Sequence, residues 1–180
     1  ALVLLALYLT ATLAGTIDGI YYTQIKEAHY SFGLFGWIAL LIISISFQVI
    51  EMFYVTPSYP DLVSRYLPLT LLCLLIVTSV AELFIPSVWV VSNILLVLLL
   101  SGYALLTLKR LTQKKRPLTD ATVWFWRMGL SSLLLSMLSM GITLFTDMGV
   151  MKTLSYIFFT SFALSIVFAM FYKIVPFLTW

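Results

Sequence analysis

Six stretches of this chain are apolar over a length that suits a membrane-spanning helix, and they constrain the fold more than any other feature. They cover residues 2–24, 30–55, 64–83, 87–108, 121–145 and 153–178. A run of about 18 or more apolar residues is typical of a transmembrane helix. Only 9% of the residues are charged, whereas a soluble domain carries about 25%. The sequence therefore predicts an all-α, polytopic transmembrane helical bundle of six spans, built as one domain from residues 1–180.

The two ends of the chain predict that it is part of something larger. The chain begins at Ala1 without a methionine, and it is still apolar at Trp180. No charged segment precedes the first apolar run and no small-residue cleavage site follows it, so it does not resemble a signal peptide. We expect a piece of a longer protein, whose partners are the lipid bilayer and either the rest of its own chain or other membrane subunits.

Half of the basic residues fall in one connection between two predicted spans, and they predict the orientation. They are Lys109, Arg110, Lys114, Lys115 and Arg116. Short loops rich in lysine and arginine stay in the cytoplasm, so we expect a multi-pass protein of the inner (plasma) membrane with both termini cytoplasmic and His29 on the outer side. A site for anionic lipid is the alternative function of this loop. The cluster lacks interleaved aromatic residues, so no nucleic-acid partner is expected.

Polar and small residues recur along one face of the predicted helix 30–55. At 100° per residue they fall within an arc of about 120°. They are His29, Gly33, Gly36, Ser44, Gln48 and Glu51. Lipid cannot solvate polar groups of this kind, so the face is predicted to turn toward protein or toward a water-lined cavity.

His29 is the only histidine of the chain, and three roles fit it. Its imidazole can ligate haem iron, and Gly33 and Gly36 would let a flat macrocycle approach the helix backbone. It can instead carry protons, or it can be an interfacial residue without a chemical role. These residues are the candidate cofactor site, and no other metal site is predicted.

Several ionisable residues lie inside the predicted spans. Asp18 lies about two turns from the outer end of the first span, where it can serve a ligand site or proton relay, or extend back to the interface. Glu51, Arg127 and Lys173 come out at a similar depth on the cytoplasmic side. Charges at equal depth usually pair. The alternatives are a structural ion-pair network, with Gln48 beside it, and a proton or ion pathway.

The last two predicted spans carry signs of close packing against neighbouring helices. Trp124 and Trp126 are predicted to anchor the first of them at the membrane interface. Small residues then recur at three- and four-residue steps in both spans, which is typical of helices that pack closely in a membrane. They are Ser132, Ser136, Ser139 and Gly141 in one span and Ser161, Ser165 and Ala169 in the other.

The stretch 27–33, followed by an apolar helix that ends at 48–53, resembles a helix of the haem–copper oxidase catalytic subunit. In that family the helix begins near the outer surface with a His-x-His-Tyr pattern and a glycine a few residues later. His29 matches the second histidine, which ligates the low-spin haem. Glu27 stands in place of the first histidine, and no residue matches the three histidines that ligate copper.

The wider pattern is similar to the NnrS-type membrane proteins, relatives of those oxidases that are linked to the response to nitrogen oxides. It rests on 29–37, 56–60, 118–127 and 172–178. The resemblance implies a haem-binding or electron-transfer protein of nitrogen-oxide or respiratory metabolism, whose second axial ligand is a methionine or lies outside this segment. The alternatives are a secondary transporter (permease) and a structural or assembly subunit. Motifs of soluble enzymes are absent, and no catalytic residue is assigned.

Overall fold

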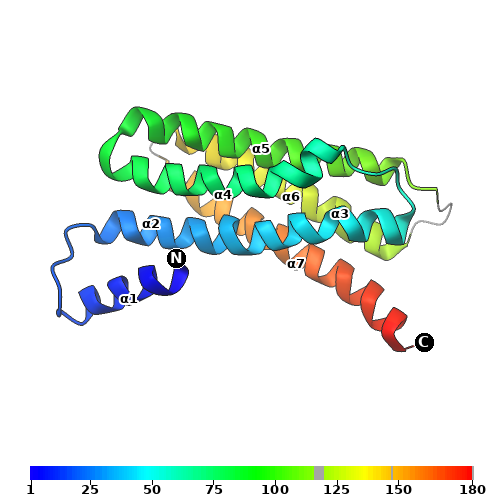
Figure 1. Ribbon diagram of the computed structural model, residues 1–180, viewed down its shortest axis with the longest axis horizontal. Helices are drawn as coiled ribbons and strands as arrows, with labels where there is room; N and C mark the ends of the chain where they lie inside the picture. Colours follow the sequence, from blue (N-terminus) through cyan, green and yellow to red (C-terminus); the bar gives the residue numbers. More distant parts are fainter. Residues whose placement is uncertain (116–119, 147, 180) are drawn as a thin grey trace.

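The computed structural model describes residues 1–115, 120–146 and 148–179, and all the regular structure in those ranges is helical (Figure 1). The elements are α1 (Leu2–Leu13), α2 (Tyr22–Gly33), the π-helix η1 (Leu34–Ala39), α3 (Leu40–Tyr54), α4 (Asp61–Phe84), α5 (Pro86–Thr112), α6 (Ala121–Thr143) and α7 (Gly149–Thr179). The predicted all-α class is confirmed.

Five helices of the described chain are long and apolar enough to cross a membrane, so the six predicted spans are not confirmed. They are the continuous helix Tyr22–Tyr54, made of α2, η1 and α3, together with α4, α5, α6 and α7. Within the predicted span 2–24, the structure has α1 and, after a break, the first residues of α2. Twelve residues rise about 18 Å, which is too short for a hydrocarbon core of about 30 Å.

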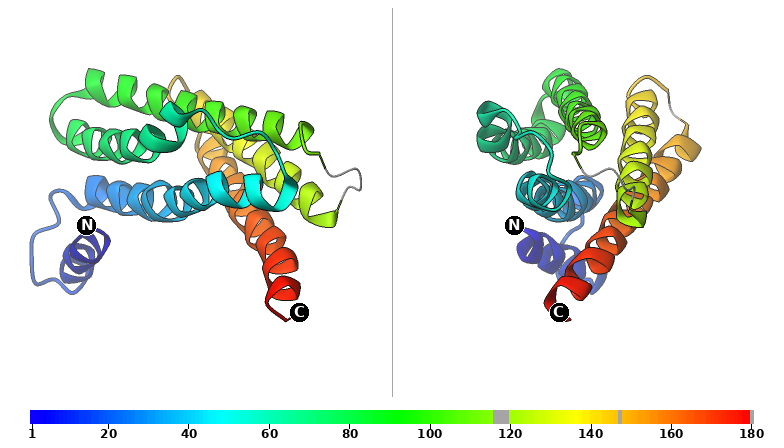
Figure 2. Two further views of the ribbon diagram at one scale, coloured as in Figure 1. Left: turned by 45° about the vertical axis from the view of Figure 1, so that its right-hand side comes forward. Right: turned by 90° about the vertical axis from the view of Figure 1, so that its right-hand side faces the viewer.

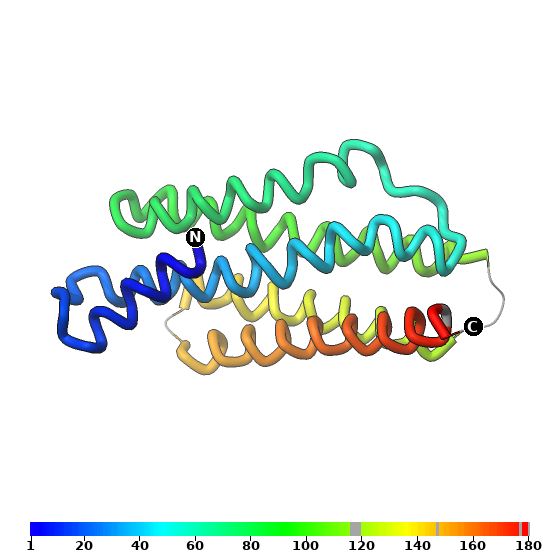
Figure 3. The backbone as a smooth tube through the Cα atoms, turned by 60° about the horizontal axis from the view of Figure 1, so that its bottom comes forward, coloured from blue at the N-terminus to red at the C-terminus, as the bar shows by residue number. Residues whose placement is uncertain are grey.

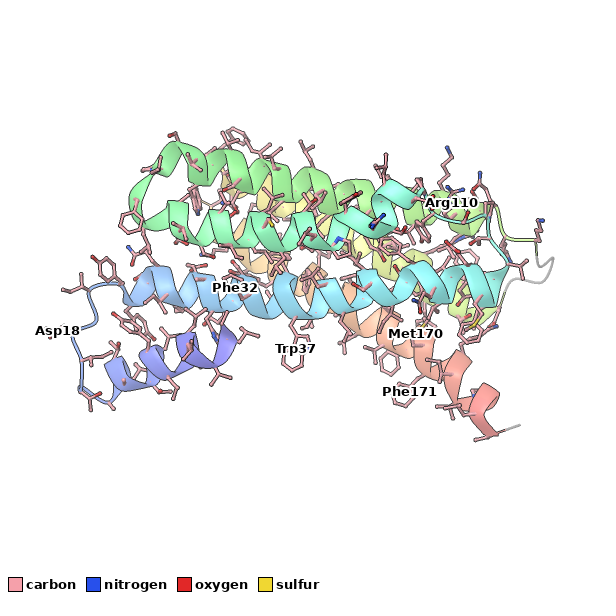
Figure 4. All side chains as sticks on the ribbon, viewed as in Figure 1. Asp18, Phe32, Trp37, Arg110, Met170 and Phe171 are labelled. Carbon is pink, nitrogen blue, oxygen red and sulfur yellow. The ribbon has the colours of Figure 1, made fainter. Side chains whose placement is uncertain are left out.

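The first apolar run breaks at a glycine. Gly15 has a φ of +70°, a left-handed conformation that glycine adopts without steric cost and that cannot continue an α-helix. The chain then turns through the exposed Asp18 (Figure 4), and α1 lies beside α2 as the other arm of a hairpin (Figure 1). Residue 1 therefore lies part-way along the central helix and not at the end of the bundle.

The long helix Tyr22–Tyr54 lies between two helical hairpins, α4–α5 and α6–α7 (Figure 2). We call the end of the bundle with residues 22–27, 84–86, 144–146 and 148–149 the outer end, and the opposite end, with 109–115, the basic end. Helices α6 and α7 run side by side (Figure 3), and α7 diverges from α3 toward the basic end (Figure 1).

Large apolar side chains cover the outside of the bundle as well as its core. Trp37 and Phe171 point away from the other helices (Figure 4), and both are exposed. A soluble protein rarely exposes apolar surface on this scale. The outside of the bundle is therefore suited to contact with the lipid bilayer.

The core lies where the central helix meets both hairpins. It contains Ala39, Ile43 and Ile50 of the central helix, Leu71, Leu75, Leu100 and Ala104 of α4 and α5, and Trp126, Leu130, Phe159 and Phe162 of α6 and α7. Buried tyrosines connect these helices through hydrogen bonds. The hydroxyl of Tyr103 donates to Ser46 Oγ at 2.8 Å, and that of Tyr54 donates to Thr122 Oγ1 at 2.8 Å. Their polar atoms are thus satisfied inside an apolar environment.

The predicted close packing of the last two spans is confirmed at the contact between α6 and α7. Ser136 Oγ donates to the carbonyl of Ser155 at 2.8 Å, and the hydroxyls of Ser132 and Ser161 lie 3.3 Å apart. Gly129 faces α7 so closely that an added Cβ would lie 3.2 Å from the backbone oxygen of Phe162. Small residues let the two backbones approach, as in other membrane helix pairs.

Candidate functional site

The polar face predicted between residues 29 and 51 does not turn as a whole toward protein. The π-helix η1 forms i→i+5 hydrogen bonds and accommodates about one extra residue in a turn, which rotates every later side chain by about 100°. Ser44 and Gln48 are exposed on the outside of the bundle, whereas Ser46 is fully buried. The prediction that Ser44 and Gln48 turn toward protein or toward a water-lined cavity is therefore wrong.

The face of His29 is directed toward α1. Residues four apart share a helix face, and a Cβ at Gly33 would lie 3.8 Å from Leu2 Cδ2 of α1. Gly36 instead allows packing against Leu75 of α4, whose Cδ1 would lie 3.4 Å from an added Cβ. The Nδ1 atom of His29 is buried, and no described residue hydrogen-bonds to it. Each of these two glycine faces therefore lies against a neighbouring helix.

The predicted trio of Glu51, Arg127 and Lys173 is not brought together. Glu51 accepts a hydrogen bond from the backbone N–H of Tyr59 at 2.7 Å, which fastens the chain reversal between α3 and α4. The guanidinium of Arg127 lies 5.4 Å from the ring centre of Trp124. Equal depth does not ensure contact, because the three helices present these side chains in different directions.

Lys173 pairs with Asp120, the N-cap residue of α6. Its Nζ lies 2.7 Å from Asp120 Oδ2, while Oδ1 of the same carboxylate accepts the N–H of Thr122 at 3.2 Å. Burial alone would raise the pKa of the Asp120 carboxyl, but the hydrogen bonds from Lys173 and Thr122 outweigh it and hold that pKa below its usual value. The ion pair ties the ends of α6 and α7 together.

A polar cavity of about 280 Å³ lies at the outer end, where the central helix meets α4, α5, α6 and α7. Eleven of its lining residues carry polar or charged side chains. They are Glu27, Ser31, Thr78, Ser79, Glu82, Asn93, Thr143, Thr146, Lys152, Ser155 and Tyr156. Leu34 and Phe35, the first residues of the π-helix, form part of its apolar wall. This polar cavity is the best candidate for a functional site in the described chain.

An ion pair between α2 and α7 forms part of the wall of the polar cavity. Lys152 Nζ of α7 donates to Glu27 Oε1 of α2 at 2.7 Å, and both side chains are partly exposed. Glu82 of α4 lines the same cavity and interacts electrostatically with both charges. Within the described residues, nothing donates a hydrogen bond to the Glu82 carboxylate or forms an ion pair with it. The cavity thus holds two carboxylates and one ammonium group, and the ammonium group is paired with Glu27.

The uncharged polar groups of the polar cavity present mainly acceptors. The hydroxyl of Thr78 donates to Leu74 O at 2.8 Å, and that of Ser79 donates to Leu75 O at 2.9 Å. Thr143 and Thr146 likewise donate to carbonyls of their own chain segment. The Asn93 amide nitrogen donates to Trp89 O at 2.9 Å. Because their hydrogens are used in this way, these side chains offer oxygen lone pairs to the cavity.

The sequence does not predict that the charged residues of this cavity, Glu27, Glu82 and Lys152, lie together. In the sequence Glu27 stands out only as a departure from the oxidase pattern, and no motif includes Glu82 or Lys152. A usable signal does exist, since all three charged residues lie within a few positions of predicted outer ends. The hydrogen bond that Asn93 makes lies within α5.

Comparisons of the chain with protein-family models, with curated proteins and with solved structures find no match. The class of the protein therefore rests on its own features. It is a helical protein with five candidate membrane spans and a polar cavity at one end of the bundle.

Proposed function

We propose that this protein is a membrane carrier (permease) for a small solute, and that the polar cavity at the outer end is its binding site. The observation that carries the proposal is that two carboxylates and a lysine line one cavity between five candidate spans. Ligand sites in helical membrane proteins lie between helices, and ionisable groups within spans are costly and mark substrate or ion pathways. The π-helix beside the cavity supports this function, because such irregular turns occur frequently at functional sites.

The orientation that we propose follows from the basic loop. Lys109 and Lys115 are exposed at the basic end, and loops of this kind face the cytoplasm. The polar cavity then opens on the outer side of the plasma membrane, and the end of α7 lies on the cytoplasmic side. Residue 1 does not share that location, because α1 is too short to cross and returns along α2.

Blocking the cavity is expected to stop solute movement. Ser79 lines the polar cavity, whereas its neighbour Val80 is 53% exposed on the outside of the bundle. We expect proteoliposomes on a solid-supported membrane to give a transient current after a jump in n-butylammonium chloride, sodium n-butyrate or pH. Ser79→Trp fills the cavity and abolishes that current, while Val80→Trp keeps it.

The outcome that contradicts a carrier is the absence of any current beyond that of protein-free liposomes in all three jumps. Equal currents from Ser79→Trp and the wild type would likewise show that the solute does not pass through the polar cavity. Either result favours a structural or assembly subunit, in which the charges set helix packing.

Haem binding through His29, with electron transfer in nitrogen-oxide or respiratory metabolism, remains a prediction from the family resemblance. The buried, unpartnered Nδ1 of His29 supports it. The packing of Leu2 against the Gly33 face speaks against it, because that contact occupies the space above the glycine. A visible absorption spectrum of the purified protein tests this alternative directly.

A further inference from the structure

The polar cavity holds one negative charge more than it can neutralise. Glu27 and Lys152 pair at 2.7 Å, which leaves the carboxylate of Glu82 without an ion-pair partner among the described residues. A carboxylate at a half-buried position within a span is stabilised by a positive partner. The charge balance of the cavity therefore favours a cation over a neutral or anionic ligand.

The free hydrogen-bond acceptors of the polar cavity favour a cation that carries hydrogen-bond donors. Asn93 is only 4% exposed, and its amide nitrogen is already used by Trp89 O. No described residue donates a hydrogen bond to its amide oxygen, although Asn93 lines the cavity. Glu82 and Asn93 thus present two free acceptors, and a ligand with N–H donors satisfies both.

The remaining wall of the cavity is apolar and aromatic. Phe35 of η1, Trp89 of α5 and Tyr156 of α7 all line it. Aromatic faces attract organic ammonium groups and pack against alkyl carbon. A volume of about 280 Å³ lies at the lower end of the range for small-molecule sites. The ligand that fits such walls is small and partly apolar.

We infer that the polar cavity binds a small protonated amine. Its N–H groups donate to the Glu82 carboxylate and the Asn93 amide oxygen, and its alkyl part packs against Phe35 and Trp89. This inference rests on the proposed function, because it assigns a substrate class to the same cavity. It excludes carboxylates, which Glu82 repels, and it disfavours quaternary ammonium ions, which carry no N–H donor.

The test is ligand binding by the purified full chain in detergent, followed as a saturable shift of the thermal unfolding midpoint in circular dichroism. We expect n-butylammonium to bind, tetramethylammonium and Na⁺ to bind more weakly, and n-butanol and n-butyrate not to bind. Glu82→Gln keeps the shape of the side chain and removes its charge, and we expect it to weaken n-butylammonium binding by about 10- to 100-fold. Asp61→Asn is the matched control at the exposed basic-end start of α4, and we expect no change.

Three results overturn the inference. The first is that the wild type does not bind n-butylammonium, and the second is that Glu82→Gln binds n-butylammonium as tightly as the wild type does. The third is that the wild type binds tetramethylammonium or Na⁺ as tightly as n-butylammonium, which would show a site selective for charge alone. Failure of the carrier proposal is distinguishable. If n-butylammonium binds in detergent but no current appears in proteoliposomes, the carrier proposal is contradicted and the amine site is supported. If n-butyrate alone gives a current, transport is supported and the amine as its substrate is contradicted.

Discussion

Trp126→Ala is expected to lower the free energy of unfolding by about 3–5 kcal/mol, the usual cost of removing a buried tryptophan. Trp126 is 1% exposed and belongs to the core between the central helix and α7. Truncation leaves a void that the surrounding helices fill only in part. Because lipid is as apolar as the core, the loss comes mainly from packing contacts and not from transfer out of water.

Trp124 provides the matched control, two positions earlier on the same helix. It is 57% exposed, and its ring contacts the guanidinium of Arg127. We expect Trp124→Ala to change the unfolding free energy by no more than about 0.5 kcal/mol. Denaturant titration in detergent micelles, read by helical circular dichroism, measures both variants without relying on tryptophan fluorescence. Similar losses for the two variants would contradict the described placement of α6.

Gly129→Leu is expected to separate α6 from α7 and to cost about 3 kcal/mol, the upper end of the overpacking range. A Cβ at this position would lie 3.0 Å from Ile166 Cδ1 and 3.2 Å from the backbone oxygen of Phe162. The side chain of Ile166 can move, but the backbone of α7 cannot do so without shifting the helix. Further leucine atoms would meet the same surface.

Gly102→Leu is the comparison for Gly129→Leu, because no atom lies within 4 Å of an added Cβ there. Leucine is favoured over glycine in a helix interior by about 0.5–1 kcal/mol, so this variant is expected to be at least as stable as the wild type. The same denaturant titration compares the two. A stable Gly129→Leu protein would show that α6 and α7 do not pack as closely as described.

The membrane-spanning helices are largely predictable from apolar runs, and the exception has a local cause. Residues 2–24 are apolar almost throughout, so composition alone cannot reveal that the chain turns back at Gly15. The change of direction depends on a single positive φ and on the exposed loop around Asp18. A glycine followed by an Asp-Gly pair is the sequence signal that indicates this turn.

The site was less predictable because its residues come from five separate helices. Projection on a straight α-helix predicts one protein-facing polar face from His29 to Glu51, but Ser44 and Gln48 are exposed on the outside of the bundle. Depth estimates grouped Lys173 with Glu51, although Asp120 is the acid that it reaches. Which side chains meet depends on helix rotation and crossing, and neither follows from the position of a residue within its span.

The polar cavity as a water-accessible solute site is tested most directly by thiol accessibility at two adjacent positions. In a Cys73→Ser background, Ser79→Cys places a thiol on the cavity wall, and Val80→Cys places one on the apolar outside of the same helix. A membrane-impermeant, positively charged methanethiosulfonate reagent is applied to sealed vesicles from the outer side. Rapid modification of Ser79→Cys, with Val80→Cys left unmodified, is the predicted result. An unreactive Ser79→Cys, or equal rates at the two positions, would contradict a solute-accessible cavity.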